Sequence, residues 1–304
     1  MKRLSFLYPL VLCLLVLGSL SGCETVIDAK LDTGPTQLSV DAILTDQPGP
    51  QTIHLTQTAP YFNSGTPSAA LSATVTVTDN VGKSYAFTDE NNDGYYVWQP
   101  ASTTDTLGHV GRTYQLTINL GGETYRASSA INRVPIVDSL VFAKTKINPL
   151  SKVEGYRAEF YTRDLPGAVD YYRIRYYRNG TLQARARDII IVQDAAFRGS
   201  ADTDGLLFIQ PIRRSVNPDS LYALNEEVKV EVQSLSLEAY NFWDALRTQI
   251  TNGGLFATPP ANVPTNITNT NPSGRKPVGF FIASAVRSRT ARIVNENIRP
   301  DDNR

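Results

Sequence analysis

The chain has 304 residues, of which 19% are charged and 41% hydrophobic, and its formal net charge is +0. This balance is typical of a globular protein and argues against a disordered chain. It also provides no basic field, so we expect no nucleic-acid partner.

The N-terminus has the pattern of a secretion signal. A basic start precedes an apolar run that is unbroken at residues 10–17, and small residues then lead to Cys23. The run is shorter than the about 20 apolar residues that a membrane-spanning helix needs. We therefore expect residues 1–22 to be a signal peptide.

The last residues of this segment, Leu20-Ser21-Gly22-Cys23, resemble a bacterial lipobox. The resemblance implies cleavage between Gly22 and Cys23, and acyl chains such as palmitate on the Cys23 sulfur and its new amino group. Each buried methylene contributes about 0.8 kcal/mol, so two or three chains anchor a protein stably. Cys23 is also the only cysteine left after cleavage, so it has no partner for an internal disulfide.

Strand patterns begin after a polar tether at residues 23–36. Apolar residues alternate with polar ones, which is typical of half-buried strands, and turn-forming residues separate the segments. The expected strands lie at residues 37–44, 52–58, 73–79, 83–89, 94–99, 113–120 and 123–130. Seven short strands predict an immunoglobulin-like β-sandwich over residues 37–132. Tyr114, at the start of a strand, is predicted to form a tyrosine corner.

A second β-rich domain is expected over residues 133–290. Its candidate strands lie at residues 137–144, 156–162, 170–180, 183–194, 205–212, 226–235 and 277–286. Asn179-Gly180 predicts a hairpin turn. A helix is expected at residues 236–251, with Ser236 as its N-cap and Ala239, Trp243, Leu246 and Ile250 at helical spacing. A long loop at residues 252–277 and a polar tail at residues 291–304 complete the predicted organisation.

The segment DENNDG matches the first half of a calcium-binding loop. Asp89, Asn91 and Asp93 alternate, so their oxygens can converge on a hard cation. The twelfth position holds Pro100, where a bidentate Glu is usual. Hairpin turns select the same residue types, so a calcium site and a plain turn both remain open. No other metal or cofactor is expected.

Aromatic and basic side chains interleave at residues 169–180. The candidate ligand surface has six members on one face of the expected hairpin: Tyr171, Arg173, Arg175, Tyr177, Arg185 and Arg187. Stacked tyrosine and arginine suit sugar rings, anionic glycans or phosphate groups. The alternative is an ordinary solvated sheet face, with Tyr172, Ile174 and Tyr176 pointing inward.

The sequence contains no zinc-ligand spacing and no Gly-x-Ser-x-Gly motif, so we expect a protein without enzymatic activity. A surface hydrolase built on paired carboxylates such as Asp202 and Asp204 stays open as an alternative, because sequence alone does not place such pairs.

Several motifs together resemble an uncharacterised Bacteroidota outer-membrane lipoprotein family, known only as a domain of unknown function. They are the lipobox, LSVDAILTDQPGPQTIHLTQTAPYF, GYYVWQ, GRTYQLTI, VDYYRIRYY and EVQSLSLEAYNFWDALRTQI with VGFFIASA. Members are often encoded beside TonB-dependent transporters. The resemblance therefore implies an outer-membrane lipoprotein that assists nutrient uptake by such a β-barrel. A stand-alone glycan- or peptide-binding module is the other reading, and the face of the membrane stays open.

Overall fold

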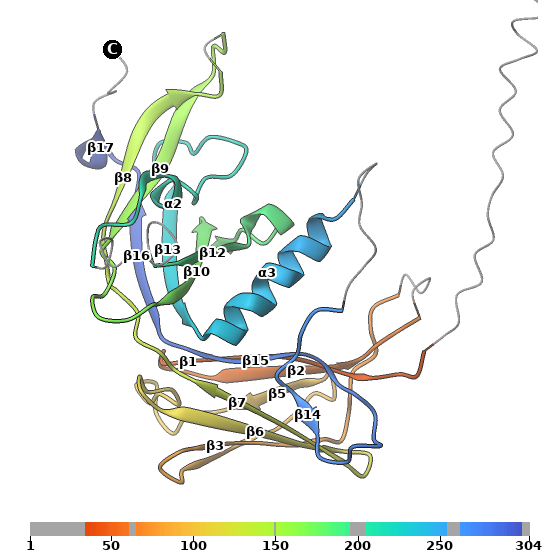
Figure 1. Ribbon diagram of the computed structural model, residues 1–304. Coiled ribbons are helices and arrows are strands. Elements are labelled where there is room, and N and C mark those ends of the chain that lie inside the picture. Colours follow the sequence, from red (N-terminus) through yellow and green to blue (C-terminus); the bar gives the residue numbers. More distant parts are fainter. Residues whose placement is uncertain (1–33, 61–64, 149, 195–204, 254–261, 300–304) are drawn as a thin grey trace, which may run out of the picture. The chain divides into compact units, whose positions relative to one another are not determined.

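Figure 1 shows the architecture of the chain in a computed structural model. The structure describes residues 34–60, 65–148, 150–194, 205–253 and 262–299. Residues 35–59 and 65–304 form one unit, and residues 1–34 with 60–64 form another. The predicted signal peptide, Gly22, Cys23 and most of the tether lie outside the described residues, as do Asp202 and Asp204.

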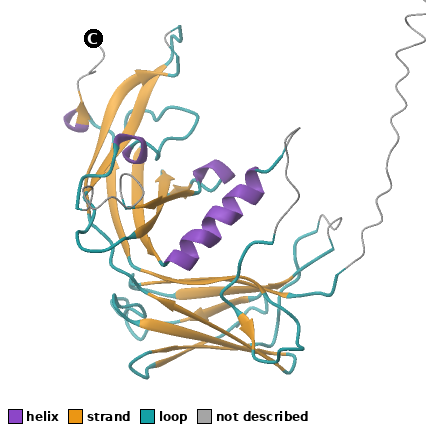
Figure 2. Cartoon of the chain, viewed as in Figure 1, coloured by secondary structure: helices purple, strands orange, loops and turns teal. Residues whose placement is uncertain are grey.

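Strands dominate the described part of the chain and helices are few, so the prediction of a mainly β protein is confirmed (Figure 2). None of the described helices is long and apolar enough to cross a bilayer.

Two sheets are built largely from the first half of the chain. The first has the order β15-β1-β2-β5, from Val278–Ser284, Leu38–Thr45, Gln51–Gln57 and Tyr95–Trp98. The second has the order β14-β7-β6-β3-β4, from Thr268–Asn269, Glu123–Ala130, Thr113–Leu120, Thr74–Asp79 and Ser84–Phe87. All seven strands expected between residues 37 and 130 are thus present.

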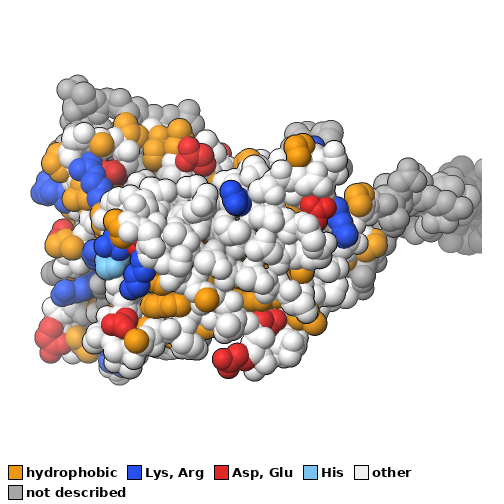
Figure 3. Space-filling model, turned by 90° about the horizontal axis from the view of Figure 1, so that it is seen from below, with side chains coloured by type: hydrophobic (Ala, Val, Ile, Leu, Met, Phe, Trp, Pro, Cys, Tyr) orange, Lys and Arg blue, Asp and Glu red, His pale blue; other side chains and the backbone are white. Residues whose placement is uncertain are grey.

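The two sheets share one core because their strands bury alternate residues. The side chains of β1 alternate in burial, and Leu38, Val40, Ala42 and Leu44 are at most 4% exposed. Between the sheets, the Ala283 amide donates to Ser129 Oγ at 2.9 Å. The face of the molecule seen from below in Figure 3 shows few charged side chains over its middle, with most of its surface formed by backbone and by side chains that are neither charged nor hydrophobic. An immunoglobulin-like connectivity stays a prediction.

The strand expected at residues 277–286 is two strands in two sheets. β15 pairs in parallel with β1, and β16 (Val286–Arg292) pairs with β13 (Glu227–Leu235). Gly279 faces Val40 in this parallel register, where an added Cβ would overlap the Val40 carbonyl oxygen. The first sheet is therefore completed by residues from the expected second domain, and the boundary near residue 132 does not separate the sheets.

The remaining strands form two further sheets. The third has the order β11-β10-β13-β16, and β12 also pairs with β10. Strand β10 is Tyr171–Arg178, β11 is Thr181–Leu182 and β12 is Ile190–Gln193. The fourth has the order β17-β8-β9, from Ile298–Arg299, Val137–Lys146 and Glu154–Thr162. The helices are α2 at Gln210–Arg213, α3 at Leu237–Thr251, and 3-10 turns at Ala186–Asp188 and Asn295–Asn297.

Four expected elements differ in the structure. The long loop predicted at residues 252–277 contains β14, which pairs with β7. The prediction of a strand at residues 205–212 is wrong, because helix α2 occupies the end of this segment. Pro211 lies in the first turn of α2, where its missing amide hydrogen is tolerated. The strand predicted at residues 183–194 is interrupted, because the Asp188 carboxylate accepts from the Arg185 amide at 3.0 Å and supports a 3-10 turn. The polar tail expected from residue 291 still contains β17, which pairs with β8.

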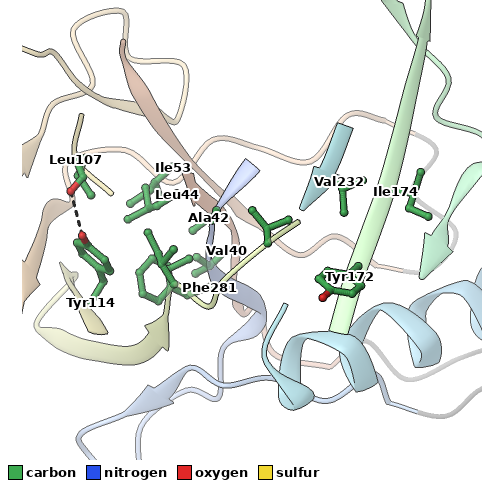
Figure 4. Close-up of a cluster of buried hydrophobic side chains, with 14 of the residues drawn as sticks. Val40, Ala42, Leu44, Ile53, Leu107, Tyr114, Tyr172, Ile174, Val232 and Phe281 are labelled. Atoms are coloured by element: carbon green, nitrogen blue, oxygen red, sulfur yellow. Dashed lines mark hydrogen bonds between the residues drawn. The ribbon is translucent and has the colours of Figure 1, made fainter. Parts of the chain in front are cut away.

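Tyr114 forms the predicted corner. Its side chain is fully buried, its hydroxyl donates to the Leu107 carbonyl at 3.1 Å, and it accepts from the His109 amide at 2.8 Å (Figure 4). Burial raises the pKa of Tyr114 to about 12, so the hydroxyl keeps its proton at neutral pH. The loop before β6 is thereby tied to the core.

Replacing Tyr114 by Phe is expected to lower the free energy of unfolding by about 1–3 kcal/mol, because a buried carbonyl and an amide lose their partner. Urea unfolding measures the change. Tyr125→Phe on the neighbouring strand is the control, since no described residue hydrogen-bonds its hydroxyl, and it should cost less than about 0.5 kcal/mol. Equal losses in the two variants would contradict this role for Tyr114.

Asp79 closes the turn between β3 and β4. Its carboxylate accepts from the amides of Lys83 at 2.8 Å and Val81 at 3.1 Å, and Arg112 Nη1 lies 2.8 Å away. Burial raises the pKa of Asp79, but the two amides and the guanidinium more than offset it, so the pKa is lowered overall. Ionised Asp79 therefore stabilises the fold above its unfolded pKa, near 3.8, and this contribution is lost as the pH falls through the folded pKa.

Asp79→Asn is expected to lower the free energy of unfolding by about 2–4 kcal/mol at pH 7, and the deficit should shrink below about pH 4. Urea unfolding between pH 2.5 and 7 measures both effects. Asp138→Asn on β8, at an exposed position, should follow the parent curve. A deficit for Asp79→Asn that is constant with pH would contradict the assignment.

Candidate ligand-binding face

Strand β10 presents two different faces. Tyr172, Ile174 and Tyr176 are at most 1% exposed and pack in the core, so their predicted inward orientation is confirmed (Figure 4). The tyrosine hydroxyls are satisfied there, since Tyr172 donates to Asp164 at 2.8 Å and Tyr176 donates to Asp188 at 2.6 Å.

The opposite face of β10 and β13, with the helix that covers part of it, is the candidate site and is called the β10 face. It consists of Tyr171, Arg173, Arg175 and Tyr177 of β10, Lys229, Glu231 and Gln233 of β13, and Tyr240 and Trp243 of α3. In the antiparallel register, Arg173 lies opposite Gln233, Arg175 opposite Glu231, and Tyr177 opposite Lys229. Four of the six predicted ligand residues are therefore brought together.

Helix α3 covers one end of this face, because it starts directly after β13. Ser236 is its N-cap, as predicted, and accepts from the Ala239 amide at 3.2 Å. The helix lies beside β10, β12 and β13 (Figure 1). The Tyr240 ring is 5.1 Å from that of Tyr171. The prediction of a helical face that includes Ile250 is wrong, since that side chain is 53% exposed.

A buried carboxylate lies at the centre of the face. Glu231 is 7% exposed; it accepts from the Tyr177 hydroxyl at 2.8 Å, and Lys229 Nζ lies 2.6 Å away. Arg175 Nη1 is more distant, at 3.7 Å. Burial raises the pKa of Tyr177 to about 12, with the Glu231 charge acting in the same direction and Arg175 against it. Tyr177 thus remains a donor at neutral pH.

Arg173 has a different environment. Its guanidinium lies 3.6 Å from the centre of the Trp243 ring, and no described carboxylate is within 4 Å of it. Burial and the neighbouring charge of Arg175 lower the pKa of Arg173 to about 10, so it is still a cation at neutral pH. The outward side chains of this end of β10 are half-buried, because Trp243 and Tyr240 of α3 pack on them, so the face is only partly solvated here.

Three buried N–H groups of the β10 face have no acceptor in the described structure: Arg173 Nε, Arg175 Nε and Trp243 Nε1. A buried donor without a partner costs about 1–3 kcal/mol. The side chains of Arg173 and Trp243 are in direct contact, and Arg175 is the next residue along the same face of β10. The face therefore combines positive charge, aromatic rings and N–H groups without acceptors, which together suit a ligand with exposed acceptor oxygens.

Arg185 and Arg187 do not join this face. They lie at the 3-10 turn, where Arg185 Nε is 3.2 Å from Asp188, and both guanidinium groups pair with Asp219. Their prediction as members of one surface failed because the strand that was to carry them is interrupted.

The DENNDG segment forms a capped turn. Asp89 accepts from the amides of Asp93 at 3.1 Å and Gly94 at 3.0 Å, and Asp93 accepts from the Tyr95 amide at 3.0 Å. This is the geometry of the turn alternative. Among the described residues, no three His, Cys, Asp or Glu side chains are grouped to hold a metal ion.

Sequence reasoning did not assign Glu231, Lys229 or Trp243 to the site. The alternation in the predicted strand at residues 226–235 places Lys229 and Glu231 on one face, but it does not identify the neighbouring strand. Trp243 was expected as an apolar contact of the helix, and its guanidinium partner depends on where the helix packs.

Arg173→Met is expected to leave the free energy of unfolding unchanged within about 1 kcal/mol or to raise it, because it removes a buried cation that lacks an ion pair. Arg178→Met is the matched control on the same strand. Arg178 contacts Glu226 at 2.7 Å and Ser220 at 2.7 Å, so its loss should cost about 2–3 kcal/mol. Urea unfolding compares the two variants. Equal destabilisation would mean that Arg173 serves the fold rather than a ligand.

Comparison with known proteins supports one assignment. No curated protein matches the chain. A family model described as a domain of unknown function, DUF4249, matches residues 24–290, which is most of the sequence. The chain therefore belongs to the DUF4249 family.

Proposed function

We propose that this chain is a non-enzymatic lipoprotein of the outer membrane that binds a ligand on the β10 face as an accessory to a TonB-dependent nutrient transporter. The observation that carries the proposal is the set of three buried donors without acceptors on that face. Their cost to the fold is offset if a ligand supplies the acceptors.

The chemistry of the β10 face favours an acidic glycan or peptide. Guanidinium groups bind carboxylate, sulfate or phosphate oxygens, and the neighbouring tyrosine and tryptophan rings suit stacking against a sugar or a planar side chain. Glu231 does not neutralise the face: Arg173, Arg175 and Lys229 supply three positive charges, against one from Glu231 and one from Asp41, which also acts on Arg173.

The anchor is supported by the lipobox that ends at Cys23. A tether at residues 23–36, if fully extended, spans at most about 50 Å. This length allows the folded part to reach the mouth or the periplasmic side of a neighbouring barrel while its acyl chains stay in the bilayer.

The family resemblance supports a transporter as the partner of the chain. A stand-alone binding module would bind its ligand on the same β10 face but would need no partner. The two differ in whether the lipoprotein has a stable partner. A partner that receives the ligand gives a membrane-anchored binding protein a direct role in uptake.

Crosslinking in intact cells, followed by detergent purification of the full-length chain, is expected to recover a large β-barrel protein. Mass spectrometry of the N-terminal peptide should show acyl chains on Cys23 in the same sample. Both results follow if the anchor holds the chain beside the transporter.

Cys23→Ser is the control, because it removes the acylated sulfur and should release the chain from the membrane and abolish the crosslink. Recovery of the acylated chain without a barrel, at matched expression, would favour the stand-alone module. An unmodified Cys23 thiol would refute the anchor.

A further inference from the structure

A second group of basic residues surrounds a single carboxylate on the sheet formed by β8, β9 and β17. Glu159 of β9 is 6% exposed. Its Oε1 accepts from the Tyr161 hydroxyl at 2.9 Å and lies 3.3 Å from Arg213 Nη2. Its Oε2 lies 3.1 Å from Arg214 Nε and 3.7 Å from Arg299 Nη1. These five residues are called the Glu159 cluster.

Three separate segments build the Glu159 cluster. Glu159 and Tyr161 are two residues apart on β9 and therefore share a face. Arg213 and Arg214 come from the end of α2, which packs on β9. Arg299 ends β17, which pairs in parallel with β8. The cluster is thus held together by tertiary structure and has no sequence motif.

The cluster carries more positive charge than a structural ion pair requires. Three guanidinium groups share one carboxylate, and no other described carboxylate lies within 4 Å of them. One arginine would neutralise Glu159, so the second and third add mutual repulsion without a further partner. Arg213 Nε is buried and has no acceptor. An anion would relieve both the repulsion and the unmet donor.

The remaining donors are accessible and oriented. The side chains of Arg214 and Arg299 are 51% and 40% exposed, so their free N–H groups can reach a ligand from solvent. The guanidinium groups of Arg213 and Arg299 lie over the Tyr161 ring, at 4.4 Å and 4.7 Å from its centre. This contact holds the guanidinium planes in place before a ligand arrives, which lowers the entropy cost of binding.

We infer that the Glu159 cluster binds a tetrahedral oxyanion, a sulfate or phosphate ester group. Three planar guanidinium groups gathered in one place offer more N–H donors than the two oxygens of a carboxylate accept, and so suit the several oxygens of such a group. Glu159 reduces the repulsion between the arginines, and its two oxygens are already occupied by four donors. The site is separate from the β10 face and does not depend on the function proposed for that face.

The test uses the full-length chain purified in an uncharged detergent, with sodium sulfate and sodium phosphate titrated against sodium chloride at equal ionic strength. Calorimetry and thermal unfolding should both show saturable binding of at least one oxyanion. Lowering the pH from 7.5 to 6 should weaken phosphate binding and leave sulfate binding unchanged, because only phosphate loses charge in this range. The comparison distinguishes the two esters.

The double variant Arg214→Gln and Arg299→Gln should weaken binding at least about tenfold, and both positions are exposed enough to leave folding intact. Glu159→Gln should strengthen binding, because it removes the competing negative charge. Arg292→Gln on β16, at a side chain that is 58% exposed, is the matched control and should bind as the parent does.

Three results would overturn the inference. The first is that neither oxyanion has a larger effect than chloride on the parent chain. The second is that the double variant binds with the affinity of the parent. The third is that a folded Glu159→Gln chain binds more weakly than the parent. Should Glu159→Gln fail to fold by circular dichroism, the double variant and its Arg292→Gln control still decide the outcome.

Discussion

Ala285 is the residue at which one unbroken stretch of chain passes from the first sheet into the third. It is fully buried; its amide donates to Ser234 Oγ at 2.9 Å, and its carbonyl accepts from the Ser234 amide at 2.9 Å. Asp46 secures the next step, since its carboxylate accepts from the Val286 amide at 2.8 Å. Buried backbone groups are costly to leave unpaired, so these bonds fix where β15 ends and β16 begins.

The position of helix α3 follows from this junction. The helix starts at the end of β13, the strand that carries Ser234, and so it must lie against the strands nearest to that end. Phe242 packs on Phe280 of β15 at 4.6 Å, while Trp243 covers Arg173 of β10. One helix therefore contacts both sheets, and the burial of Arg173 is a consequence of that placement.

The distribution of charge distinguishes the two candidate sites from the rest of the fold, although the net charge is +0. Several other buried or partly buried carboxylates have one arginine partner each, as in Arg112 with Asp79, Arg133 with Asp170 and Arg287 with Asp46. The β10 face and the Glu159 cluster depart from this pattern in different ways. The first leaves buried donors without acceptors beneath an aromatic cover, and the second gathers three cations around one anion. The uncompensated donors and positive charge are the reason for proposing a ligand at each place.

Features that depend on neighbouring residues could be predicted from the amino-acid sequence. Alternation identified the strands of the first two sheets, Ser236 marked the start of α3, Asn179-Gly180 marked a turn, and Tyr114 marked its corner, because these signals arise within a few residues. The lipobox at Cys23 is likewise a local signal, and it stays a prediction.

The pairing of the strands, and hence the residues that each site contains, depends on long-range contacts that the sequence does not reveal. Strand β15 is buried on both faces over most of its length, and β16 is mostly exposed, so neither shows an alternation that would indicate its neighbours. The parallel partner β1 and the split at Ala285 could therefore not be predicted. For the same reason, the contact of Trp243 with Arg173 and the gathering of three arginines around Glu159 were not predicted. Each joins segments far apart in the chain, and the free energy that brings them together comes from burial shared by the whole core rather than from any local pattern.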